Sequence, residues 1–162
     1  MKVYKVYFEQ QLPTDIQTAW NFFSSPFNLS KITPPEMNFK ITNGVQPMDK
    51  MYAGMIINYH VSPLLNIQLN WTTEITHVKE NQYFIDEQRL GPYALWHHQH
   101  HFKTIENGVL MTDVLHYAVP YGVFGKLLNS WFIKNKIKAI FMHRKKAVTQ
   151  IFGSYSNNSE PI

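Results

Sequence analysis

FIDEQRLGPYALWHHQHHF, residues 84–102, is the stretch that decides how this chain folds. Large apolar and polar side chains alternate on both sides of the pair Gly91-Pro92. Alternation with a period of two is typical of half-buried β-strands, and Gly-Pro is a strong turn signal. The stretch therefore predicts two neighbouring antiparallel strands, Tyr83–Leu90 and Ala94–Ile105, joined by a short turn.

The strand pattern extends in both directions from this hairpin. Runs rich in Val, Ile, Tyr and Phe continue upstream and downstream, separated by turns that contain Gly, Pro and Asn. Consecutive strands joined by short turns form antiparallel sheets, so the chain predicts one bent, seven-stranded antiparallel sheet. The further strands are expected at residues 2–10, 39–42, 55–61, 67–75 and 109–119.

Helical patterns precede and follow the strands. Thr14 and Gln17 match a capping box, and Pro26 suits the first position of a second short helix. Near the C-terminus an apolar stripe predicts one helix over residues 123–152, about 45 Å long. A helix of this length can cross the whole concave face of the sheet. We expect it to bury Phe124, Trp131 and Ile137.

Composition limits the function classes. The 162 residues are a typical single-domain length, and we expect one domain over residues 1–152 and a flexible polar tail over 153–162. The chain has no cysteine, which excludes disulfides, thiol nucleophiles and thiolate metal sites. No apolar run approaches the roughly 20 residues of a membrane span, and none matches a signal peptide. We therefore expect a cytoplasmic protein with no integral membrane segment.

The net charge of +4 is local, because seven Lys and Arg residues lie between residues 126 and 146. A solvated helix face explains this cluster, although a basic patch also attracts anionic partners. The rest of the chain is close to neutral, which argues against a dedicated nucleic-acid binder. The sequence predicts no nucleic-acid partner and leaves a homodimer open.

The polar strand residues are the candidate functional residues. Strand parity places them on the same faces as large aromatic rings, so a concave interior would combine apolar walls with a few polar groups. Such an interior is typical of a small-molecule site. The predicted ligand-binding residues are Trp71, Phe84, Asp86, Gln88, Trp96, His98, His100, Phe102, Asp113 and Tyr117.

Three interpretations of the polar residues stay open. They form a structural network that fixes strand register, they orient a ligand, or a His beside a carboxylate supplies acid–base catalysis. No nucleophile motif accompanies them, so no catalytic residue is assigned. His98 and His100 with Asp113 approach a metal-ligand set, but His97 and His101 face the opposite way. We expect no metal and no other cofactor.

The order strand, two helices, six strands, long helix resembles the START/Bet v1-like helix-grip superfamily, also called SRPBCC. Bacterial single-domain ligand-binding members are the nearest in pattern; they are described as polyketide cyclase/dehydrase-like and often labelled cell-division inhibitors. The residues that carry the resemblance are Trp71, Glu74, Ile75, Phe84, Asp86, Gln88, Gly91, Pro92, Tyr93, Trp96, His98, His100, Phe102, Asp113, Tyr117, Pro120, Gly122 and Gly125.

The resemblance implies an α+β helix-grip fold with a cavity between the sheet and the C-terminal helix. It implies binding of a hydrophobic or amphipathic small molecule, of a lipid, isoprenoid or polyketide-like class. Two alternatives belong to other function classes: a cyclase- or dehydratase-type enzyme that uses the buried His/Asp cluster, and a protein-interaction module. The basic C-terminal helix is the only support for the last.

Overall fold

The computed structural model describes residues 1–64, 67–120, 122 and 132–155. The predicted fold class, α+β with a seven-stranded antiparallel sheet, is confirmed. In chain order the elements are β1 (Tyr4–Leu12), α1 (Ile16–Phe23), the 3-10 helices η1 (Pro26–Ile32) and η2 (Pro35–Met37), β2 (Lys40–Ile41), β3 (Met55–Leu64), β4 (Ile67–Lys79), β5 (Tyr83–Leu90), β6 (Leu95–Ile105), β7 (Gly108–Ala118) and α3 (Lys134–Phe152).

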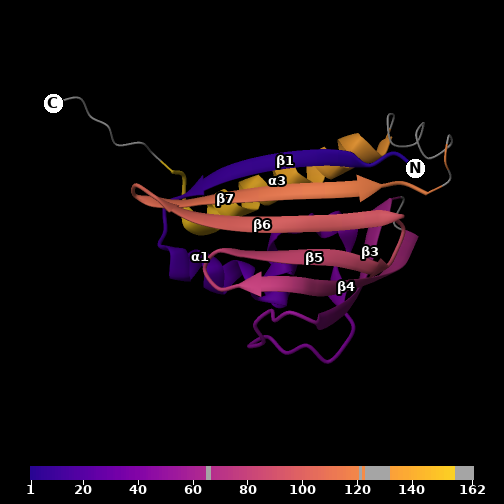
Figure 1. Cartoon of the computed structure of the whole chain (residues 1–162), viewed down its shortest axis with the longest axis horizontal. Coiled ribbons are helices and arrows are strands. Elements are labelled where there is room, and N and C mark those ends of the chain that lie inside the picture. The colour runs from indigo at the N-terminus through magenta and orange to yellow at the C-terminus, as the bar shows by residue number, and fades with distance from the viewer. Residues whose placement is uncertain (65–66, 121, 123–131, 156–162) are drawn as a thin grey trace.

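The sheet is a meander with one crossover. Its strand order is β1-β7-β6-β5-β4-β3-β2, so the first strand pairs with the last, and every pair is antiparallel. Register shifts interrupt the β3–β4 and β4–β5 pairs. Shifts of this kind bend a strand and increase its twist. Figure 1 shows α3 running behind β1 and β7, along the length of the strands.

Alternation on the long strands separates an inner from an outer face, as predicted. On β7 the buried side chains are Val109, Met111, Asp113, Leu115 and Tyr117, and the residues between them are half-buried; Ala118 at the strand end is buried as well. On β6 they are His98, His100 and Phe102. The predicted concave face is therefore the buried face of both strands.

Helix α3 packs on this inner face. Ile137 and Phe141 belong to one buried cluster with Leu115 and Tyr117 of β7. The prediction that Ile137 is buried is confirmed. The structure describes a helix over 134–152; the expected residues 123–131, with Phe124 and Trp131, lie outside the described residues.

The short helices close one end of the sheet. Helix α1 begins one residue later than the capping box implied: Asp15 is its N-cap and accepts a hydrogen bond from the Thr18 amide at 2.9 Å. The predicted role of Thr14 as N-cap is therefore wrong, because Asp15 holds that position and caps the helix with its own side chain. Pro26 does open the next helix, which has 3-10 geometry.

The last described element is α3, and Tyr155 after it donates a hydrogen bond to the Glu106 carbonyl. Helix α3 ends at Phe152, and the expected polar tail over 153–162 is described only as far as residue 155. The domain boundary at residue 152 stays a prediction. Within the described residues, no helix combines the length and the apolar character needed to cross a bilayer.

Candidate ligand site under the C-terminal helix

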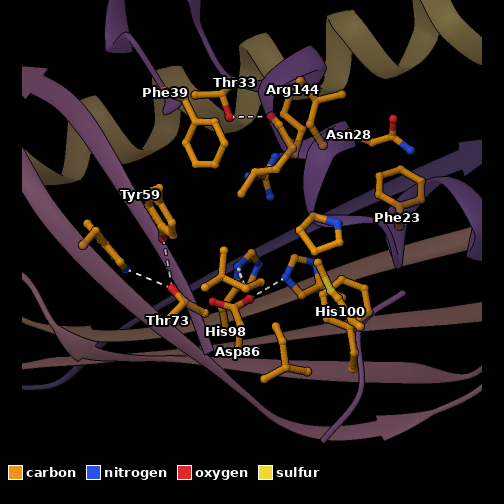
Figure 2. Close-up of a pocket in the computed structure, with 18 of the residues that line it drawn as sticks. Phe23, Asn28, Thr33, Phe39, Tyr59, Thr73, Asp86, His98, His100 and Arg144 are labelled. Atoms are coloured by element: carbon orange, nitrogen blue, oxygen red, sulfur yellow. Dashed lines mark hydrogen bonds and ion pairs between the residues drawn. The ribbon is translucent and has the colours of Figure 1, made fainter. Parts of the chain in front are cut away.

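A cavity of about 150 Å³ lies between the inner face of the sheet, the short helices and α3. Apolar side chains make most of its wall: Leu29 from η1, Tyr59 and Trp71 from the sheet, and Ile140 from α3. Figure 2 shows Arg144 reaching toward the cavity from the helix side and Asp86, His98 and His100 from the sheet side. The cavity therefore has an apolar wall and a small group of charged residues.

The cavity is smaller than expected from a typical ligand site of about 300–1,000 Å³. Aromatic rings fill part of the space by packing on one another. Trp71 and Trp96 meet edge to face, with ring centroids 5.2 Å apart, and Tyr93 lies 4.8 Å from Trp96. The expected aromatic wall is present, but these rings also form core contacts.

The ten predicted site residues separate into three groups. Six of them line the cavity, and Phe102, Asp113 and Tyr117 are buried outside its lining. Gln88 was expected in the polar interior, and this is wrong. Its side-chain amide donates to the Tyr93 carbonyl and accepts from the Tyr93 amide, so it closes the β5–β6 turn. The six that line the cavity are Trp71, Phe84, Asp86, Trp96, His98 and His100.

Two aspartates and two histidines form a compact cluster on the inner face. The strand register places Asp86 opposite His98, and Asp113 opposite His100. His98 Nε2 lies 2.8 Å from Asp113 Oδ1, and His100 Nε2 lies 2.8 Å from Asp86 Oδ2. Each histidine thus contacts a carboxylate on a neighbouring strand. The predicted Asp–His network is confirmed for these four residues.

Burial and mutual contacts shift the pKa values of this cluster in opposite directions. For Asp113, burial alone would raise the pKa, but the close contacts and charges of His100 and His98 hold the pKa well below its usual range. Burial and the charge of His100 lower the pKa of His98. Burial also acts to lower the pKa of His100, but contacts with Asp113 and Asp86 outweigh it and raise that pKa. The two histidines therefore differ: carboxylate contacts raise the pKa of His100, and burial lowers that of His98.

Arg144 was missed in the sequence, although helical spacing could have found it. It follows Ile137 by seven residues and Ile140 by four, so it lies on the face of α3 that meets the sheet. Its Nε is buried and has no hydrogen-bond partner among the described residues. Its guanidinium lies 5.2 Å from the centre of the Phe141 ring. A buried donor without a partner is a natural contact for a polar ligand atom.

The other two histidines of the dense β6 segment lie on the outer face, as predicted. His97 Nδ1 contacts Glu87 at 2.7 Å, and its other nitrogen lies 3.0 Å from Gln99. His101 contacts the same Gln99. Glu87 also pairs with Arg89. This outer ladder is separate from the inner cluster because strand side chains alternate between faces.

Comparison with known proteins identifies the fold. No family model matches the sequence, and no curated protein matches it. Among solved structures, protein CV1439 from Chromobacterium violaceum is similar with a TM-score of 0.69 and 11% identity, over 93% of this chain and 98% of that one. Major latex-like protein 151 from Panax ginseng is similar with a TM-score of 0.67 and 13% identity, over 93% and 97%. TTHA0849 from Thermus thermophilus has a TM-score of 0.63 and 14% identity, over 91% and 98%.

These similarities extend over nearly the whole length of each chain at low sequence identity. Together with the sheet order and the helix on the inner face, they show that the chain has the helix-grip fold of Bet v1-like proteins. The resemblance found in the sequence is confirmed at the level of the fold.

Proposed function

We propose that this chain binds a small hydrophobic or amphipathic molecule in the cavity under α3. The single observation that carries the proposal is the cavity itself, which has aromatic and aliphatic walls and the unpaired Nε of Arg144 at its edge. An apolar wall favours ligands through the burial of apolar surface, and a few polar groups fix their orientation. The lipid, isoprenoid and polyketide-like classes all share this amphipathic character.

The size of the cavity favours a compact ligand or a compact end of a larger one. A dry cavity of about 150 Å³ is known to accept benzene, and the cavity here has the same volume. A single ring or a short branched end therefore fits without rearrangement. An oxygen atom on the ligand would find a donor in Arg144, because a guanidinium presents five N–H groups and no acceptor.

The test uses two fluorescent dyes with the same ring system, neutral N-phenyl-1-naphthylamine and its sulfonated analogue 8-anilinonaphthalene-1-sulfonate. The phenyl ring of each dye is the compact end that the cavity can accept. We expect both to bind with a stoichiometry near one. Ile140→Trp fills the cavity and should weaken both dyes at least about tenfold. Ile151→Trp is the matched control, because Ile151 is on the same helix, is 43% exposed and does not line the cavity.

Ligand contact by Arg144 is read from the difference between the two dyes. In Arg144→Gln the sulfonated dye should lose affinity relative to the neutral one. Equal weakening of both dyes by Ile140→Trp and Ile151→Trp would place binding on the surface and contradict the proposal. The cyclase or dehydratase and the protein-interaction alternatives stay predictions, because no contact among the described residues favours them over binding.

A further inference from the structure

Three side chains that line the cavity converge at its sheet side. Asp86 comes from β5, and His98 and His100 come from the neighbouring strand β6, two residues apart on one face. One nitrogen or oxygen atom from each lies within 4.8 Å of the other two. All three side chains are largely buried, with Asp86 the most accessible at 17%.

Behind them lies a second carboxylate that does not line the cavity. Asp113 Oδ1 is 2.8 Å from His98 Nε2 and 2.9 Å from His100 Nδ1, so one oxygen faces both rings. The contact with His100 is bent outside hydrogen-bond geometry. An aspartate in this place directs one nitrogen of each ring away from the cavity.

The other nitrogen of each ring faces Asp86. His98 Nδ1 lies 3.5 Å and His100 Nε2 lies 2.8 Å from the same Asp86 Oδ2. A neutral imidazole carries only one N–H. With the N–H of His98 on Nε2, donated to Asp113, the lone pair of His98 Nδ1 and the carboxylate oxygen of Asp86 point at one another. His100 Nε2 faces the same oxygen and either donates a proton to it or, without that proton, adds a second lone pair. Such a set is repulsive unless a cation lies between its members, and that cation is either a proton or a metal ion.

We propose that Asp86, His98 and His100 bind one divalent transition-metal ion, with Asp113 behind both imidazoles and hydrogen-bonded to that of His98. Metal-bound histidines commonly donate their second N–H to a carboxylate, and that partner fixes the ring orientation. For bonds of about 2.1 Å, neighbouring ligand atoms are about 3.0–3.4 Å apart. The two contacts of Asp86 Oδ2, at 2.8 and 3.5 Å, lie on either side of this range.

The ligand set selects the class of metal. Two imidazoles and one carboxylate, without thiolate, suit Zn²⁺, Fe²⁺, Co²⁺ or Ni²⁺ better than Ca²⁺ or Mg²⁺. Three protein ligands leave coordination positions open, as in catalytic rather than structural sites. The open positions would face the cavity, because the three ligands line it and Asp113 is behind them. An oxygen of a bound molecule could then complete the coordination shell.

The sequence predicted no metal, because the third ligand depended on strand pairing. His98 and His100 were visible as a His-x-His pair, and Asp113 was considered as their carboxylate partner. The β5–β6 register instead brings Asp86 to the cavity side, and Asp113 stays on the inner face but outside the cavity lining. The proton is the competing occupant.

The experiment titrates the purified full chain, treated first with a chelator, with Co²⁺ and with Zn²⁺. Calorimetry should give one equivalent of each, and bound Co²⁺ should show visible absorption bands. His98→Ala and Asp86→Asn should abolish this binding, and Asp113→Asn should weaken it about 10–100-fold. The matched control is the double variant His97→Ala and His101→Ala, which removes two histidines of the same strand on the opposite face.

One measurement tests the metal site even if the His98, Asp86 and Asp113 variants fail to fold. X-ray absorption of the wild-type Zn²⁺ complex should show two imidazole ligands, which tests the site without any substitution. The proposal is overturned if the wild type binds no metal stoichiometrically, which would assign the cluster to protons. It is also overturned if the His97→Ala/His101→Ala variant loses the metal. Neither result bears on dye binding, so this proposal and the proposed function fail separately.

Discussion

Asp113 is the residue that joins the polar cluster to the core of the sheet. It is 3% exposed and faces both histidines, while its neighbours on the inner face of β7 are the apolar Met111 and Leu115. A charge buried among apolar groups is tolerated only when it is paired, and removal of one partner leaves the other uncompensated. Asp113 therefore stabilises the fold only while its carboxylate is ionised.

Asp113→Asn should lower the free energy of unfolding at neutral pH by about 3–5 kcal/mol, measured in denaturant with a chelator present. The folded-state pKa of Asp113 lies below its unfolded value, so its contribution is present above the unfolded pKa and is lost as pH falls below it. The stability of the wild type should thus fall more steeply than that of Asp113→Asn below about pH 4. Glu80→Gln, at an exposed site, is the control. Parallel pH curves for wild type and Asp113→Asn would contradict the assignment.

Strand parity predicted the inner location of His98, His100 and Asp113, because a period of two needs no knowledge of the partner strand. It did not predict Gln88 correctly, since the β4–β5 register shifts around this residue and its amide binds the turn. It also could not show that Asp86 rather than Asp113 faces the cavity. Both residues lie on the inner face, and which of them lines the cavity depends on how α3 and the short helices pack over each strand.

At the scale of the elements, the β6–β7 turn shows how a correct prediction can rest on an incomplete reason. Asn107-Gly108 was expected as a turn from its composition, and it is one. The left-handed residue is Asn107, with φ of 60°. Gly108 is needed for a different reason: a Cβ there would lie 2.2 Å from the Leu12 carbonyl oxygen on β1. This approach comes from the pairing of the first and last strands, which local sequence does not reveal.

Gly108→Ala should therefore destabilise the protein by about 1–3 kcal/mol, because the new methyl group forces β1 and β7 apart. Gly44→Ala is the control, since a Cβ at Gly44 meets nothing within 4 Å. Its effect should stay within about 0.5 kcal/mol. Urea denaturation of both variants makes the comparison. If the two midpoints shift equally, the close approach of β1 at Leu12 is wrong.

At the scale of the whole molecule, helix and sheet share one core around the cavity. Phe8 of β1 stacks on Phe141 of α3 with ring centroids 4.2 Å apart, and Phe141 also lies edge-on to His98 at 5.6 Å. The element order and the apolar stripe were enough to predict that the helix covers the concave face. The cavity volume was not predictable. It is the small space that remains between the curved sheet and α3 after the aromatic rings have filled the rest.

Phe141→Ala tests whether α3 is held through this face. The ring is 5% exposed, and its removal should lower the free energy of unfolding by about 3–5 kcal/mol, as for other buried phenylalanines. Met142→Ala is the matched control, because the next residue of the helix is 53% exposed. Amide hydrogen exchange should rise in both α3 and β1 of Phe141→Ala, since the lost stacking contact joins them. Exchange that rises in α3 alone, with β1 unchanged, would mean that the helix is attached to the sheet elsewhere.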